Sequence, residues 1–129
     1  MKKPIPPLDL LFYLMETHDN PKHVAGLQVF EKPADAGEGY MLDLVERLRK
    51  IPPVDPFNFK PVFPRVGMPQ WQSVDDMEME YHLRHSALPR PGSMEQLMEV
   101  IQRLHASFPG RERPGWICQV IEGLQNDRF

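Results

Sequence analysis

A chain of 129 residues allows one domain with its own hydrophobic core, and 41% hydrophobic with 26% charged residues is ordinary for a globular protein. The net charge of -3, without basic blocks, excludes nucleic acid as a main partner. No run of residues approaches the ~18 apolar residues of a membrane span, and no signal peptide is present, so we expect a cytoplasmic protein.

The single cysteine, Cys118, can form neither an internal disulfide nor a cysteine-based metal cluster, and it suits a reducing compartment. Because Cys118 falls inside a predicted strand, we expect a buried thiol that acts as a small hydrophobic side chain.

The first predicted helix covers Leu8 to Glu16, after an extended leader at Pro4 to Pro7. This helix is apolar nearly all round, which favours burial in the core over a membrane-dipping role. The stretch from His23 to Phe30, HVAGLQVF, is predicted as a strand that contributes core side chains, with Gly26 marking a bulge or a close backbone approach.

Two amphipathic helices are predicted from their apolar periodicity. Tyr40 to Lys50 is the first, and Ser93 to Phe108 is the second, which begins with a capping box of Ser93 and Gln96. The apolar faces consist of Met41, Leu44, Val45 and Leu48 in the first, and Met94, Leu97, Met98, Ile101, Leu104, His105 and Phe108 in the second. Between them, Pro52 to Pro69 is rich in proline and is expected to be irregular.

The remaining elements are predicted strands: Gln70 to Val74, Glu80 to Leu88, and a buried one at Ile117 to Leu124. Gln125-Asn126-Asp127 is suited to a tight turn, and Arg128 would begin a return strand. We therefore expect an α/β (mixed α+β) fold with a mixed sheet and flanking helices.

The edge of the last predicted strand lacks a partner in the sequence, because the chain ends where the return strand would begin. The chain is therefore expected to be the first part of something longer, with residues 1–129 forming one truncated domain. An open edge also predicts self-association.

Two groups of residues could carry chemistry. His82 and His85 would share a face on a helix and could bind a metal, but on a strand they point to opposite faces, and the strand interpretation is favoured, so we expect no metal site. The carboxylates of Asp76, Glu78 and Glu80 could act as acid and base, although a solvated edge is favoured.

Several separated segments resemble the bacterial wax ester synthase/acyl-CoA:diacylglycerol acyltransferase family. The opening at Pro4 to Asp9 is similar to its PLxxxD motif, and His23 to Leu27 resembles its HVGGL-like strand. Tyr81 to Pro89 resembles a YHVRHxxLP segment, while Arg111 to Trp116 with Val120 to Leu124 resembles DRxRPLW…IEGL. Ile5, Ala25 and the middle stretch, residues 54–69, depart from the family pattern.

This resemblance implies the fold of CoA-dependent acyltransferases, and an enzyme that transfers a fatty acyl group from acyl-CoA to a long-chain alcohol or diacylglycerol. The family's catalytic HHxxxDG motif is absent and would lie beyond Phe129, so no catalytic residue, metal or cofactor is assigned, and the chain alone is expected to be inactive. Pro4, Leu8 and Asp9 are the motif candidates for substrate binding. The carboxylate of Asp9 would otherwise simply stabilise a helix start.

Two alternatives stay open. The chain could be a non-catalytic lipid-surface or protein-interaction module, or a relative of the condensation domains of peptide synthesis. Contact with lipid droplets or with the inner membrane surface is expected from the apolar helix and from the segment that holds Phe57, Phe59 and Phe63.

Overall fold

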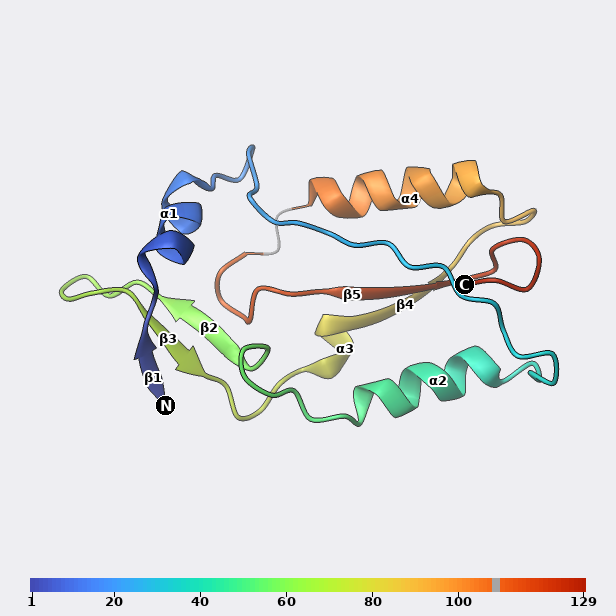
Figure 1. Ribbon diagram of the computed structural model, residues 1–129, viewed down its shortest axis with the longest axis horizontal. Helices are drawn as coiled ribbons and strands as arrows, with labels where there is room; N and C mark the ends of the chain where they lie inside the picture. The colour runs from blue at the N-terminus through green and yellow to red at the C-terminus, as the bar shows by residue number, and fades with distance from the viewer. Residues whose placement is uncertain (108–109) are drawn as a thin grey trace. The chain divides into compact units, whose positions relative to one another are not determined.

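The computed structural model describes residues 1–107 and 110–129, which form two compact units (Figure 1). Unit 1 contains Met1–Val24, Pro53–Met77 and Ser107–Trp116, and unit 2 contains Ala25–Pro52, Glu78–Ala106 and Ile117–Phe129.

Unit 1 is built on an antiparallel sheet with the order β1 (Lys2–Pro4), β3 (Gln70–Ser73), β2 (Phe59–Val62). The strand predicted at residues 70–74 is confirmed. The irregular stretch predicted at residues 52–69 is wrong in part, because it contains β2 with Pro61 opposite Trp71. Proline lacks an N–H but is tolerated here because β2 is an edge strand. Strand β1, which ends at the first residue of the predicted leader, was not predicted.

Helix α1 (Pro7–Met15) forms where predicted, with proline at its start and Asp9 in its first turn. The prediction that α1 is a buried core helix is wrong, because none of its residues is buried. The large apolar side chains that are half or more exposed are Leu8 (65%), Leu11 (50%), Phe12 (53%), Leu14 (70%) and Met15 (54%). An apolar helix surface favours burial, but its composition does not show whether residues of the same chain or another molecule would bury it.

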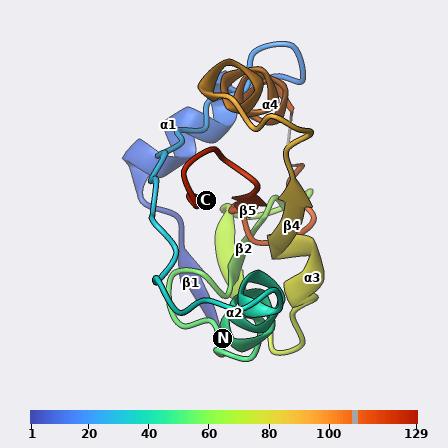
Figure 2. The same ribbon diagram turned by 90° about the vertical axis from the view of Figure 1, so that its right-hand side faces the viewer.

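Unit 2 is built on two parallel strands, β4 (Leu83–Ala87) and β5 (Cys118–Glu122). Helices α2 (Tyr40–Arg49) and α4 (Met94–Ala106) lie on opposite sides of this strand pair (Figures 1 and 2). The strand predicted at residues 80–88 is confirmed in part, because its second half forms β4. The first part of that stretch, however, is a short helix, α3 (Met79–His82), which ends as β4 begins.

The core of unit 2 confirms both predicted amphipathic helices. On α2, Met41 and Val45 are buried, and Arg49 Nε donates to the Leu83 carbonyl of β4 at 3.0 Å. On the α4 side, a buried cluster is formed by Leu88, Leu97 and Leu124, with Val100, Ile101 and Ile121 packed against it. On α4, Met94, Met98 and His105 are exposed, contrary to the predicted face, and Phe108 lies outside the described residues.

The capping box of α4 is confirmed in both directions. The Gln96 amide donates to Ser93 Oγ at 3.2 Å, and Gln96 Oε1 accepts from the amides of Ser93 at 2.9 Å and Gly92 at 2.8 Å. The two side chains thus satisfy the amides of Ser93 and Gln96, and Gln96 gives the Gly92 amide a second acceptor beside the Pro89 carbonyl at 2.9 Å.

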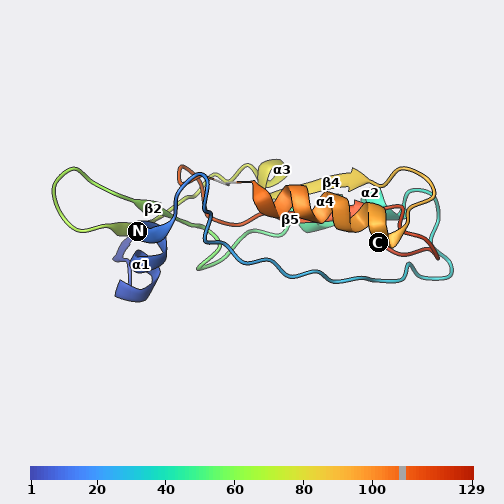
Figure 3. The same ribbon diagram turned by 90° about the horizontal axis from the view of Figure 1, so that it is seen from above.

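The strand predicted at residues 23–30 is wrong. This stretch runs as an extended trace (Figures 1 and 3) but forms no ladder, and Val24 is 95% exposed. Only its last residue is paired: Phe30 exchanges two main-chain hydrogen bonds with Phe129, and beyond it Glu31 forms an antiparallel bridge with Arg128. A strand needs a partner for its backbone groups, and among the described residues no partner lies along residues 24–29.

The predicted turn at residues 125–127 is confirmed. Asn126 (φ 63°) and Asp127 (φ 53°) both adopt left-handed backbone, which brings Arg128 back to an antiparallel bridge with Leu124.

Cys118 is exposed at the start of β5, so the expectation of a buried thiol is wrong. The mixed α/β class is confirmed, although the described strands form one antiparallel and one parallel sheet in place of a single mixed sheet.

Candidate functional site

The three motif candidates lie together at the start of unit 1. Pro4 ends β1 opposite Gln70, and Leu8 and Asp9 occupy the first turn of α1, where both are exposed. The carboxylate of Asp9 is near the positive end of the helix dipole, which favours a negative charge there. The structure therefore places these candidates on an open surface.

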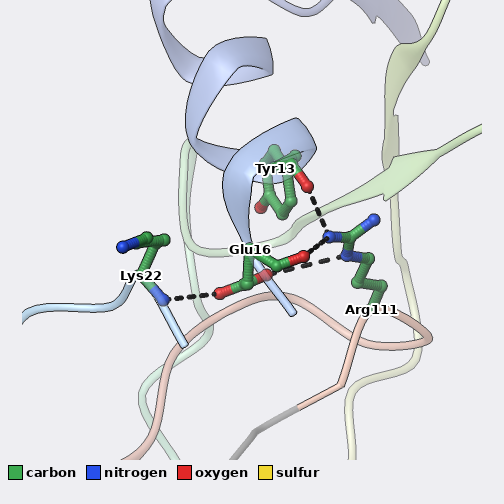
Figure 4. Close-up of polar contacts among 4 residues, drawn as sticks. All are labelled: Tyr13, Glu16, Lys22 and Arg111. Carbon is green, nitrogen blue, oxygen red and sulfur yellow. Dashed lines mark hydrogen bonds and ion pairs between the residues drawn. The ribbon is translucent and has the colours of Figure 1, made fainter. Parts of the chain in front are cut away.

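The other end of α1 is held by Arg111 (Figure 4). One guanidinium nitrogen, Nη2, donates to the main-chain carbonyls of Tyr13 and, at 3.3 Å, of Glu16, while Nε lies 3.6 Å from the Glu16 carboxylate. The other oxygen of that carboxylate accepts from the Lys22 amide at 3.2 Å. Carbonyls in the last turn of a helix lack partners within the helix, and a cation there also complements the dipole. We call this set of contacts the Arg111 clamp.

Aromatic rings surround the clamp. The Arg111 guanidinium lies 5.5 Å from the ring centre of Tyr13 and 5.3 Å from that of Phe63, and Tyr13 makes edge contacts with Phe63 and Trp71, each at 5.7 Å. Burial of the phenol raises the pKa of Tyr13, and the charges of Glu16 and Asp9 raise it further, while Arg111 opposes them. The Tyr13 hydroxyl therefore stays protonated at neutral pH, which suits a hydrogen-bonding role and not that of a base.

The residues that follow Arg111 extend these contacts within unit 1. Trp116 Nε1 donates to the Phe57 carbonyl at 2.7 Å, and the two rings meet edge to face at 5.9 Å. A Cβ at Gly115 would lie 3.6 Å from the Tyr13 hydroxyl, which places this stretch against α1. Residues 111–116 thus connect α1 to the segment that precedes β2.

In unit 2, the two segments that resembled family motifs lie side by side as β4 and β5. His85 Nε2 lies 2.5 Å from Glu122 Oε2, and Gln119 donates to the Ser86 hydroxyl at 3.0 Å. Each pair joins a residue of β4 to one of β5. Both pairs therefore fix the two strands in register, and the carboxylate of Glu122 also sets the orientation of the imidazole.

The remaining candidates are not gathered into a site. His82 is buried in α3 while His85 is in β4, and among residues 1–107 and 110–129 no cluster of three metal-ligating side chains occurs. The expectation that Asp76, Glu78 and Glu80 are solvated is confirmed, since all three are exposed. No helix in this described part of the chain is long and apolar enough to cross a membrane.

Sequence reasoning named Arg111 as part of a motif but missed Tyr13 and Glu16 as its partners. They are 98 and 95 positions away in sequence, so no local pattern could have joined them. The only signal was the simultaneous presence of the two motif segments, one around α1 and one around Arg111.

Comparison with known proteins gives a consistent result. The family model of the wax ester synthase/diacylglycerol acyltransferase catalytic domain matches residues 5–129. The chain is 35% identical to the O-acyltransferase WSD of Acinetobacter baylyi, over 98% of this chain and 27% of that protein. It is 37% identical to a probable diacylglycerol O-acyltransferase of Mycobacterium tuberculosis, over 95% of this chain and 28% of the relative.

A solved structure agrees with these sequence matches. The wax ester synthase/diacylglycerol acyltransferase from Marinobacter aquaeolei VT8 superposes with a TM-score of 0.90 and 37% identity, over 98% of this chain and 31% of that one. The chain spans less than a third of the length of each of these relatives. Because the family model covers nearly every residue, the chain belongs to the wax ester synthase/diacylglycerol acyltransferase family.

Proposed function

We propose that this chain forms the N-terminal segment of an O-acyltransferase that moves a fatty acyl group from acyl-CoA to a long-chain alcohol or to diacylglycerol. The observation that carries the proposal is the family match over residues 5–129. The motif segments support it, because the Arg111 segment holds the end of the helix that follows the Pro4–Asp9 opening, and those in unit 2 pair as β4 and β5.

The general base of the reaction is not expected to come from these 129 residues. Acyl transfer to an alcohol requires a group that removes the hydroxyl proton as the oxygen attacks the thioester carbon. The family motif places two adjacent histidines at that step, and this sequence contains no His-His pair. We therefore assign the chain the roles of scaffold and part of the substrate wall.

The isolated chain is expected to form no wax ester from labelled palmitoyl-CoA and hexadecanol, and no triacylglycerol when diacylglycerol is the acceptor. Loss of a catalytic base alone typically lowers the rate by ~10²–10⁴-fold. The Marinobacter relative, assayed in parallel, shows that the assay detects ester. Turnover by the isolated chain at the rate of that relative would refute the proposal.

We further propose that α1 contacts a lipid surface, at a lipid droplet or at the inner membrane. Its five exposed apolar side chains lie on one short helix, and the loop between β2 and β3 adds Val66 (91% exposed) and Met68 (71% exposed) in the same unit. Contiguous exposed apolar side chains of this kind mark interaction surfaces, and acyl chains are a partner that needs no polar complementarity.

Flotation with phospholipid vesicles checks this contact. The double change Leu8→Glu and Leu14→Glu should lower the vesicle-bound fraction about tenfold or more, because each leucine inserted into lipid contributes ~1.5–3 kcal/mol. Leu42→Glu is the matched control, since Leu42 is 55% exposed but lies on α2. Absence of vesicle binding by the unaltered chain, or an equal loss with Leu42→Glu, would rule out α1 as the contact.

Self-association is also proposed, because β5 pairs with β4 on one edge and has no strand on its other edge among the described residues. Light scattering should then show species heavier than the monomer at micromolar concentration. A monomer over that whole range would exclude it.

A further inference from the structure

The connection between β2 and β3 presents apolar side chains to solvent. It consists of residues 63–69, FPRVGMP, and extends beyond the ends of both strands (Figures 1 and 3). Val66 is 91% exposed, Met68 is 71% exposed and Phe63 is 38% exposed. We call residues 63–69 the hairpin tip. Because neighbouring apolar side chains are unfavourable in water, such a tip marks a surface that contacts an apolar phase or partner.

The two ends of the hairpin tip are anchored within unit 1. The Phe63 ring meets the Tyr13 ring edge to face at 5.7 Å and lies 5.3 Å from the Arg111 guanidinium. At the other end, the Pro69 carbonyl accepts from the Ile5 amide at 3.4 Å. The hairpin tip is therefore held against α1 and the residues just before it, while Val66 and Met68 between the anchors stay in solvent.

The hairpin also has a charge opposite to that of the whole chain. Residues 57–74 contain no Asp or Glu, although the net charge of the chain is -3. Their cations are Lys60 and Arg65, one positive charge each. Arg65 is exposed, and its guanidinium makes no hydrogen bond, ion pair or ring contact with any residue in the described part of the chain. Its planar set of N–H donors matches the oxygens of a phosphate group.

The sequence places this cation directly beside the apolar side chains, since Arg65 precedes Val66 and lies three positions before Met68. A partner that satisfies both features must offer phosphate within a side-chain length of an apolar phase. The boundary between the headgroups and the acyl chains of a phospholipid surface has this arrangement. A soluble phosphate or nucleotide offers the anion without the apolar phase, and a neutral lipid offers the reverse.

We propose that the hairpin tip inserts at the headgroup boundary of a phospholipid surface and gives the chain a preference for anionic phospholipids. Val66 and Met68 enter the acyl region, and Arg65 binds lipid phosphate above it. The inference rests on the lipid contact proposed for α1, and it adds the element of unit 1 that inserts and the class of headgroup that this element selects.

Flotation of the full chain tests this preference. The two surfaces are vesicles of phosphatidylcholine alone and vesicles of equimolar phosphatidylcholine and phosphatidylglycerol, and the chain should bind the second more tightly. Arg65→Gln should lower affinity for the anionic vesicles about fivefold, which is the contribution of one cation near such a surface, and should leave affinity for the neutral vesicles unchanged. Arg103→Gln, at an exposed arginine of α4 in unit 2, is the matched control and should change neither affinity.

Insertion of the hairpin tip is measured with a nitrobenzoxadiazole label, whose fluorescence shifts to the blue in an apolar medium. The label is attached at Met68→Cys in a chain that carries Cys118→Ser, since Cys118 is the only cysteine and is exposed. The shift should appear when anionic vesicles are added. The control is the same label at Leu42→Cys, because Leu42 is 55% exposed on α2 and should give no shift.

Three results would overturn the inference: equal affinity for the two kinds of vesicle, equal losses with Arg65→Gln and Arg103→Gln, or a label at Met68→Cys that stays in water while the chain is bound. Binding to neither vesicle would overturn it together with the proposed contact of α1. The two proposals can also be separated. If Leu8→Glu with Leu14→Glu leaves binding intact while Arg65→Gln lowers it, the contact of α1 fails and the role of the hairpin tip stands.

Discussion

Gly92→Ala is expected to lower the free energy of unfolding of unit 2 by about 2–4 kcal/mol. A Cβ at this position would lie 1.8 Å from the Gly123 carbonyl oxygen, far inside van der Waals contact, and Gly92 has a φ of 73°. The Gly92 carbonyl also accepts from the Gln125 amide at 2.9 Å. Because the obstructing atom is backbone, relief of the clash would separate the loop before α4 from the end of β5.

Urea unfolding measures this effect, with Gly37→Ala as the matched control. A Cβ at Gly37 meets no atom within 4 Å and no positive φ is recorded there, so the control should change stability by less than about 0.5 kcal/mol. Equal midpoints for the two variants would mean that the contact between residues 92 and 123 is absent in solution.

Arg111→Ala is expected to release the end of α1 from the rest of unit 1. The substitution removes the donors to the Tyr13 and Glu16 carbonyls and the cation beside the Glu16 carboxylate, whose side chain is only 11% exposed. Hydrogen bonds from a charged donor contribute about 1.5–3 kcal/mol, and a carboxylate left without its partner adds to the loss. The opening free energy of α1 should therefore fall by about 2–3 kcal/mol.

Hydrogen exchange of the α1 amides reports this opening, and it should accelerate by about 30–150-fold for that change in free energy. Arg111→Lys keeps the positive charge but lacks the planar guanidinium with its several N–H donors, so an intermediate acceleration of exchange is expected. Arg65→Ala, at an exposed arginine of the β2–β3 loop, is the control and should leave α1 unchanged. If Arg111→Ala also leaves α1 unchanged, the clamp does not hold this helix.

Features determined by neighbouring residues were predicted well from the sequence. The capping box of Ser93 and Gln96, the periodicity of α2 and the left-handed turn at Asn126 each depend on a few adjacent positions. Such local preferences act in the same direction as the final fold, so the pattern and the structure agree.

Features determined by distant partners were predicted poorly. The apolar composition of α1 suggested burial, but the described residues leave every residue of this helix unburied. The stretch at residues 23–30 has strand-like composition but no neighbouring strand, and Pro61 enters β2 because that strand is at an edge. The same distinction holds for the candidate site. The motifs identified Asp9 and Arg111, while the contacts of Arg111 with α1 depend on the tertiary fold and were not predicted.

Whether this chain supplies the scaffold of an acyltransferase without its base can be measured with a chimera. The chain replaces the matching 31% of the Marinobacter wax ester synthase/diacylglycerol acyltransferase, and ester formation from palmitoyl-CoA and hexadecanol is compared with that of the isolated chain. We predict ester from the chimera and none from the isolated chain, because the proposed function places the base outside these 129 residues. Ester formation by the isolated chain, or a folded chimera that makes no ester, would contradict this assignment.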